Sequence, residues 1–456
     1  MNVHGIAPTQ AGRRIDTLDL LRGFAICGIL LMNIPFMGGI GFSQGLPRPM
    51  HWNADWIALV VQLLFFEGTM RGLFTVLFGA AMLLMLRGPG GVGSDGMGLD
   101  GAGPEAGRFD VWARRCLALM LLGVVQWAVF LWPGEILWNY GLCGLLLLGF
   151  RTLRPRALLV WAGVFLAGLS LLTAVTRYEQ ADLQRTSLVA QEAKAAGHAL
   201  SEEQSEAIKQ VATMRAQIHP DAAAVKAEVV KRTSLPGVFL WSLNMWAELN
   251  LSAEGWQTVA ESLGFMLLGM ALLRTGILSG EARPGLYWRL VVIGYSLGLG
   301  LRAVGLVYSA RMGFDIAPEL AIPLANALKG GCYEVARLAV MFGHLGLIVG
   351  LYQRGMLGRA WPVRAMGRMA LTIYSLQSIL TSLLFYGLGQ VGHFGFAGMM
   401  GIAVAIWLVT CAFAVWWLSF SAMGPAEYVL RRLAYGARLA RGRQLTGGGT
   451  EPVHAA

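Results

Sequence analysis

The chain has 456 residues, of which 56% are hydrophobic and only 14% are charged. An ordinary soluble domain has about a quarter of its residues charged, so this composition excludes a soluble globular protein. The formal net charge of +10 does not indicate nucleic-acid binding, because the arginines lie in short loops between apolar runs, where the positive-inside rule of membrane proteins already explains them.

Ten apolar runs follow one another along the chain, and a helix needs about 20 apolar residues to cross a bilayer. The fourth run is short and the second is long. We therefore predict an all-α, polytopic transmembrane helical bundle with about ten spans. The runs cover residues 18–40, 54–86, 111–131, 136–150, 157–176, 255–273, 286–310, 333–352, 365–386 and 396–420.

The loops between the runs carry their arginines on alternate sides of the predicted membrane. With the N-terminus in the cytoplasm, the cytoplasmic loops and the C-terminal segment hold most of them, while the short outer loops carry only Arg48, Arg311 and Lys329. Positive residues gather on the cytoplasmic side of membrane proteins. We therefore expect both termini to be cytoplasmic.

The segment 177–234 stands apart, because it is rich in Ala, Glu, Gln and Lys. Ser201 and Gln204 have the spacing of a capping box, and Pro220 interrupts the helical pattern. We predict two or three helices in a small extracytoplasmic insertion. The chain then divides into a membrane half at 1–176, the insertion at 177–234, a second membrane half at 235–423 that opens with an interfacial helix, and a cytoplasmic basic amphipathic helix with a disordered tail at 424–456.

Charged residues inside the spans are the candidates for function, since a charge near the bilayer centre costs about 3 kcal/mol or more unless it is paired or faces a wet cavity. Glu67 and Arg71 have the i,i+4 spacing of a helical ion pair, and Glu334 and Arg337 are three residues apart. We predict a polar cavity, open to the outer face, that binds a small-molecule substrate. Its other expected members are Asn33, Glu135, Asn139, Tyr140, Glu261 and Arg302.

Structural ion pairs between helices are the alternative interpretation of the same charges. His51, in the first outer loop, is a candidate acid–base residue beside the expected cavity. The sequence has no metal-ligand spacing and no glycine-rich nucleotide-binding motif, so we predict no metal site.

Five segments carry a family pattern: RIDxLDxxRGxA at 14–25 followed by Asn33, FEGxxRxLFTxLFG at 66–79, LWxGEILxxY at 131–140, GRMALTxYxxQS at 367–378 and GPxExxxRxLxY at 424–435. Together they resemble the YeiB-type family of bacterial membrane proteins. The resemblance extends over nearly the whole chain and implies a multi-pass protein of the bacterial inner membrane, surrounded by the lipid bilayer. It implies no settled activity.

The opening LDxxRG at 18–23 is also similar to membrane acyltransferases of the heparan-α-glucosaminide N-acetyltransferase type. This resemblance implies transfer of an acyl group from cytoplasmic acyl-CoA, such as acetyl-CoA, to an acceptor across the membrane. Arg114 and Arg115 would then bind acyl-CoA, His51 or Glu67 would act as the base, and Arg71 would hold a developing negative charge.

Two further functions stay open. In a transporter, the intramembrane charges would form a gated site for a polar or anionic solute or for protons. In a membrane scaffold, the segment 177–234 would contact an envelope partner. A homo-oligomer is compatible with all three functions.

Overall fold

The computed structural model describes residues 15–39, 53–86, 104–218, 220–311, 322–358 and 360–436. These residues form helices and no strand. Nine helical segments among them are long and apolar enough to cross a membrane, and the shorter apolar segment Leu137–Phe150 accounts for the short fourth run. The predicted all-α, polytopic membrane bundle is therefore confirmed.

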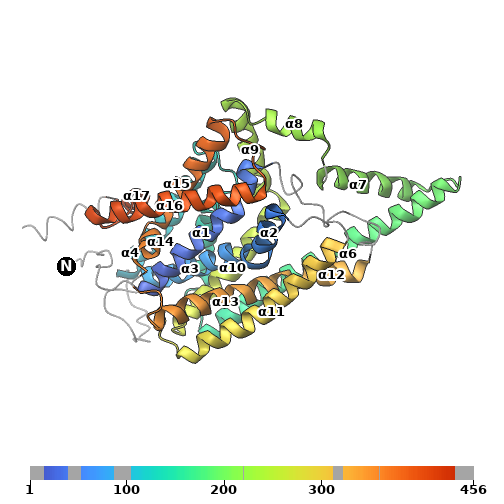
Figure 1. Ribbon diagram of the computed structural model, residues 1–456. Helices are drawn as coiled ribbons and strands as arrows, with labels where there is room; N and C mark the ends of the chain where they lie inside the picture. The colour runs from blue at the N-terminus through green and yellow to red at the C-terminus, as the bar shows by residue number, and fades with distance from the viewer. Residues whose placement is uncertain are drawn as a thin grey trace, which may run out of the picture.

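The helices follow one another with short connections (Figure 1). They are α1 (Asp16–Gly38), α2 (Ala54–Val61), the π-helix η2 (Gln62–Phe66), α3 (Thr69–Leu86), α4 (Pro104–Ala128), α5 (Leu137–Leu146), the 3₁₀-helix η3 (Leu147–Phe150), α6 (Pro155–Ala195), α7 (Glu202–Ile218), α8 (Ala222–Val230), α9 (Leu235–Leu251), α10 (Ala253–Arg274), α11 (Pro284–Arg311), α12 (Pro323–Gly331), α13 (Tyr333–Gln353), α14 (Trp361–Arg368), α15 (Ala370–Ser382), the π-helix η5 (Leu383–Gly387), α16 (Phe396–Phe420) and α17 (Pro425–Tyr435).

Helices α1, α3, α10 and α13 form the centre of the bundle, and most of their side chains are buried. Close approach of their backbones depends on glycine. A Cβ at Gly367 of α14 would collide with the Asp19 carbonyl of α1, and one at Gly79 of α3 would collide with the Met266 carbonyl of α10. Small residues at such crossings let membrane helices pack through van der Waals contact.

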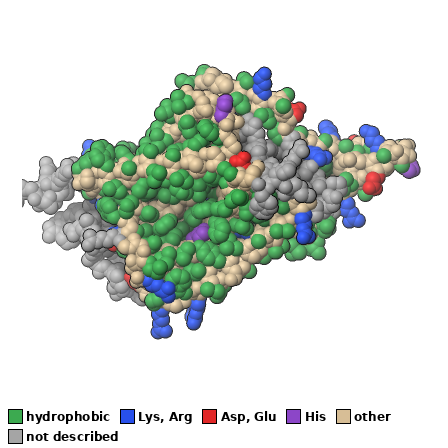
Figure 2. Space-filling view, in the orientation of Figure 1, with side chains coloured by type: hydrophobic (Ala, Val, Ile, Leu, Met, Phe, Trp, Pro, Cys, Tyr) green, Lys and Arg blue, Asp and Glu red, His purple; other side chains and the backbone are tan. Residues whose placement is uncertain are grey.

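Helices α6, α11 and α16 lie at the periphery and expose apolar side chains, among them Leu171, Val304 and Leu408. Hydrophobic side chains cover most of the bundle face in Figure 2, whereas charged ones gather toward its two ends. An apolar surface of this extent is what a lipid-facing surface requires. The helices therefore support contact with the bilayer.

The insertion is built on a long helix. Helix α6 runs from Pro155 through the expected boundary at residue 177 to Ala195, so one helix belongs to both the membrane half and the insertion (Figure 1). The predicted capping box is confirmed: the Ser201 N–H donates to Gln204 Oε1 over 3.0 Å, and the Gln204 N–H donates to Ser201 Oγ over 3.1 Å. Below, the end of the bundle from which α6 protrudes is called the insertion end.

Candidate functional site

Glu67 and Arg71 are separated by a break in the second span. In π-helix η2 the Glu67 N–H donates to the Gln62 carbonyl over 2.9 Å, and Gly68 then adopts a φ of 64° before α3 begins. Only glycine adopts a positive φ without steric cost. The predicted ion pair between Glu67 and Arg71 is therefore wrong, because the i,i+4 spacing brings side chains together only along a continuous helix.

Arg71 instead pairs with Glu261 of α10, and Arg337 of α13 pairs with the same carboxylate. Arg337 also donates to Glu334 over 3.1 Å, so the predicted pair one turn apart on α13 is confirmed. Glu261 lies about 12 Å along α10 from its first residue, a depth at which an unpaired charge is costly. Two carboxylates and two guanidinium groups therefore neutralise one another inside the bundle.

The two arginines of this cluster differ in access. The Arg337 side chain is 1% exposed, whereas that of Arg71 is 33% exposed. Glu67 is half-buried beside them, and its carboxylate makes no hydrogen bond with any described residue, although it interacts electrostatically with Arg302 and Arg337. Arg71 is therefore the more accessible arginine of this cluster, and Glu67 is a carboxylate beside it without a hydrogen bond from the described residues.

Tyr140 joins the cluster from α5. Its hydroxyl lies 2.5 Å from Thr75 Oγ1, and Thr75 donates to the Arg71 carbonyl over 2.7 Å. Asn139 lies on the same helix and accepts from Cys143, whose thiol also contacts the Val259 carbonyl of α10 at 3.6 Å. The structure therefore places both predicted α5 residues on the side of α5 that meets α3 and α10.

Glu135 does not belong to this cluster. It caps the start of α5, where its carboxylate accepts from the N–H groups of Leu137 (2.6 Å) and Trp138 (3.0 Å) and from Nε1 of Trp246 (3.1 Å). Burial raises the pKa of Glu135 to about 6, and these hydrogen bonds oppose the shift. This arrangement is structural, so the expected role of Glu135 in substrate binding finds no support in its contacts.

Asn33 is half-buried on α1 and makes no hydrogen bond with a described residue. His51 lies outside the described residues. A histidine in the middle of a span, such as His344, is expected to form hydrogen bonds inside the bundle, and this is confirmed: its Nε2 binds a backbone carbonyl of the broken second span. The sequence did not indicate which group it binds.

The expected acyl-CoA residues lie toward the opposite end of the bundle, on α4. Arg114 is exposed and pairs with Asp110 over 2.9 Å. Arg115 is partly buried, its Nε is inaccessible, and its guanidinium makes no hydrogen bond or ion pair with any described residue. Its charge interacts over longer range with those of Arg22 and Glu427. The two neighbouring arginines are therefore not equivalent.

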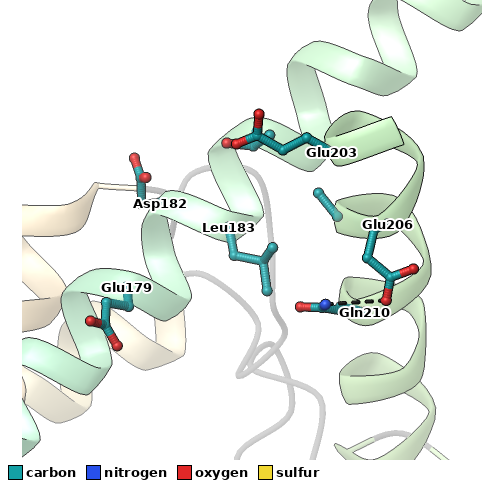
Figure 3. Close-up of a pocket in the computed structure, with 8 residues that line it drawn as sticks. Glu179, Asp182, Leu183, Glu203, Glu206 and Gln210 are labelled. Carbon is teal, nitrogen blue, oxygen red and sulfur yellow. Dashed lines mark hydrogen bonds between the residues drawn. The ribbon is translucent and has the colours of Figure 1, made fainter. Parts of the chain in front are cut away.

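The insertion contains a separate hollow of about 310 Å³ between α6 and α7 (Figure 3). Carboxylates dominate it, and Glu206 accepts a hydrogen bond from Gln210 over 3.2 Å. None of the predicted site residues lines it. Its lining consists of Glu179, Asp182, Leu183, Thr186, Glu203, Glu206, Ala207 and Gln210.

Comparison with known proteins gives relatives without a described activity. Residues 272–437 match the model of a family described as a protein of unknown function, DUF418. The chain is 27% identical to the uncharacterized protein YxaH of Bacillus subtilis, over 94% of this chain and 96% of the relative. It is 26% identical to the uncharacterized protein YeiB of Escherichia coli, over 91% of this chain and 95% of the relative. No solved structure matches the chain.

Proposed function

We propose the function of the chain from its own polar groups, because the DUF418 model that its residues 272–437 match is a family of unknown function and its relatives YeiB and YxaH are uncharacterized. We propose a bacterial inner-membrane acyltransferase that passes an acyl group from cytoplasmic acyl-CoA to an acceptor bound near the insertion end. Bound acyl-CoA supplies an activated thioester. The rest of the proposal concerns what the side chains of this chain do.

The observation that carries the proposal is Arg115. A partly buried guanidinium without a carboxylate partner costs several kcal/mol, and an anionic ligand offsets that cost. The phosphate groups of coenzyme A match a guanidinium in charge and in hydrogen-bond geometry. Arg114, by contrast, already has Asp110 as its partner at the surface. We therefore assign the donor contact to Arg115 and not to the pair.

A short series of packed contacts connects Arg115 to the cluster at the insertion end. Its neighbour Cys116 lies so close to α5 that a Cβ at Gly144 would meet its Sγ at 2.6 Å. Tyr140, one turn earlier on α5, contacts Thr75. Thr75 in turn contacts the backbone of Arg71. Contacts among α4, α5 and α3 therefore link the helix that carries Arg115 with the helix that carries Arg71.

Glu67 and Arg71 take the chemical roles at the acceptor side. A carboxylate that carries no hydrogen bond from the described residues is free to accept a proton from a hydroxyl or amine acceptor, which is general-base catalysis. Arg71 binds Glu261 through one terminal nitrogen and retains other N–H donors. These donors can stabilise the negative charge that forms on the carbonyl oxygen during acyl transfer.

The first test is thermal unfolding of the detergent-purified chain with and without acetyl-CoA. A ligand at about 100 times its Kd should stabilise the fold by about 2.7 kcal/mol. We expect a dose-dependent rise in Tm that Arg115→Ala removes and that Arg114→Ala retains. Arg115→Ala without ligand should be at least as stable as the wild type, because it removes a charge that has no ion pair or hydrogen bond among the described residues.

Absence of any rise in wild-type Tm at millimolar acetyl-CoA would contradict the proposal. Equal loss of the effect in both variants would place the donor contact at the surface and overturn the assignment to Arg115. Transfer itself is then measured by release of free thiol from acetyl-CoA when membrane acceptors are added, with Glu67→Gln as the inactive variant.

A transporter is the second candidate, and the broken spans favour it. The second span breaks at Glu67 and Gly68, and a one-residue break at Cys332 separates α12 from α13 just before the eighth run. The two breaks adjoin, since a Cβ at Gly68 would meet the Tyr333 hydroxyl at 2.8 Å. Discontinuous helices form the substrate sites of many transporters. Uptake of a small anion into proteoliposomes that Glu67→Gln abolishes, without any effect of acetyl-CoA, would favour this candidate.

A further inference from the structure

The break in the second span exposes backbone carbonyls at membrane depth. Inside a bilayer each backbone polar group without a partner costs several kcal/mol, so irregular backbone persists there only when protein groups or water satisfy it. Five carbonyls of this break, those of Leu63, Leu64, Phe65, Glu67 and Gly68, accept hydrogen bonds from side chains of α11 and α13.

Arg302 of α11 donates to three of these carbonyls, of which the Glu67 carbonyl also accepts from the Thr69 N–H (2.7 Å) and from Thr69 Oγ1 (3.1 Å). Its Nη1 donates to Leu63 and Leu64 over 3.0 Å each, and its Nη2 donates to the Glu67 carbonyl over 2.6 Å and to Thr69 Oγ1 over 3.0 Å. None of its hydrogen bonds to the described residues goes to a carboxylate. Its guanidinium therefore binds the broken helix as a cation binds a set of oxygen ligands.

Two residues of α13 complete the arrangement. His344 donates from Nε2 to the Phe65 carbonyl over 2.8 Å, while its Nδ1 accepts from the Tyr295 hydroxyl over 2.7 Å, which fixes the tautomer. Arg337 donates from Nε to the Gly68 carbonyl over 3.0 Å. Arg302 forms hydrogen bonds with residues before and after the turn that holds Glu67. In this segment His344 bonds only to Phe65, before the turn, and Arg337 bonds only to Gly68, after Glu67.

We propose that the broken segment is a guanidinium-binding site whose ligand is the tethered side chain of Arg302. Arg302 is then a positioning residue: it keeps the helix open, so that Glu67 stays free of Arg71 while Arg71 pairs with Glu261. The assignment of this site stands on the contacts alone. Its consequence for Glu67 as a base rests on the proposed function.

A site of this kind allows chemical rescue. Arg302→Ala leaves the carbonyls of Leu63 and Leu64 without their side-chain donor and removes one donor from the Glu67 carbonyl. We therefore expect amide hydrogen exchange in a peptide over residues 62–72 to become about tenfold faster. Guanidinium ion at low millimolar concentration should restore slow exchange, because it presents the same planar donors. Sodium ion at equal ionic strength should not restore it.

Two further variants keep the test decisive. Arg311→Ala, at the exposed end of the same helix, removes a positive charge without touching the break and should leave the exchange of this peptide unchanged. Arg302→Lys retains one ammonium that cannot reach four acceptors, so we expect intermediate exchange that guanidinium does not improve. The lysine variant also gives a result if the alanine variant fails to fold.

Exchange that guanidinium and sodium restore equally, or that neither restores, would overturn the proposed site. The outcome is separable from the proposed acyl transfer. If acyl transfer is wrong but the site is right, guanidinium rescues Arg302→Ala while acetyl-CoA has no effect on the wild type. If both are right, Arg302→Ala keeps its stabilisation by acetyl-CoA, loses thiol release, and regains that release when guanidinium is added.

Discussion

Single residues illustrate which contacts a sequence can predict. The pairing of Glu334 with Arg337 was predictable, because both lie on one uninterrupted turn of α13. The pairing of Arg71 was not, because its partner Glu261 is distant in the sequence. The spacing rule fails where a glycine with positive φ interrupts the helix, and that interruption depends on side chains from other helices.

Glu135 gives a prediction for pH dependence. Burial raises its pKa to about 6, above the ordinary value of about 4.3. A carboxyl group with a raised folded-state pKa contributes its full share of stability below about pH 4.3 and loses it as pH rises toward 6. Glu135→Gln should remove this dependence, so that stability relative to the wild type rises by about 2 kcal/mol between pH 4 and pH 7.

The measurement is unfolding in detergent, followed by tryptophan fluorescence at several pH values. A constant difference between Glu135→Gln and the wild type over this range would show that the carboxylate is not buried as described. Glu254→Gln is a suitable control, because this residue is exposed in the first turn of α10. It should change stability little at any pH.

At the scale of helices, length and apolar composition predicted the spans, because both are local properties of the chain. The breaks within spans were not predicted. One lies between α14 and α15 at Met369, where Glu427 of α17 accepts from the N–H groups of Leu371 (2.7 Å) and Thr372 (3.2 Å). A carboxylate from elsewhere in the chain thus caps the start of α15.

Glu427→Ala should loosen α17 from the bundle. Loss of a cap of this type costs about 1 kcal/mol. Of the side-chain hydrogen bonds between α17 and α15, only the one from the Ala426 N–H to Thr372 Oγ1 then remains. We expect a lower Tm and faster cleavage by trypsin after the exposed Arg432. Glu202→Ala, on the exposed start of α7, serves as the control and should leave cleavage at Arg432 unchanged. Unchanged cleavage in Glu427→Ala would show that other contacts hold α17.

At the scale of the whole molecule, the insertion is attached to the bundle through α6 and also through a second contact, at Arg232. Arg232 follows α8 and is 3% exposed; it donates to the Gly39 carbonyl at the end of α1 over 3.0 Å and stacks over the Trp241 ring at 4.9 Å. The boundary expected at residue 177 was drawn from falling hydropathy. Helix propensity does not fall there, because Ala, Glu, Gln and Lys are good helix formers, so α6 continues.

Arg232→Met should release the α8 side of the insertion while α6 remains attached. The Gly39 carbonyl loses its donor, and hydrogen bonds from charged donors contribute about 1.5–3 kcal/mol each. We expect amide exchange over α8 to become about tenfold faster, measured by mass spectrometry. The exposed neighbour provides the control: Lys231→Met breaks only the pair with Glu228 and should have little effect. Equal effects of the two variants would contradict an anchoring role for Arg232.

The continuity of α6 has a mechanical consequence. A helix of 41 residues is about 60 Å long, and α6 packs closely enough on α12 that a Cβ at Gly330 would meet the Arg177 side chain at 2.7 Å. Because α6 is one continuous helix, its protruding part and the part packed in the bundle tilt together about the point where the helix leaves the bundle. A load on the tip of the insertion produces a torque on α12, and α12 leads directly into the span that carries Arg337.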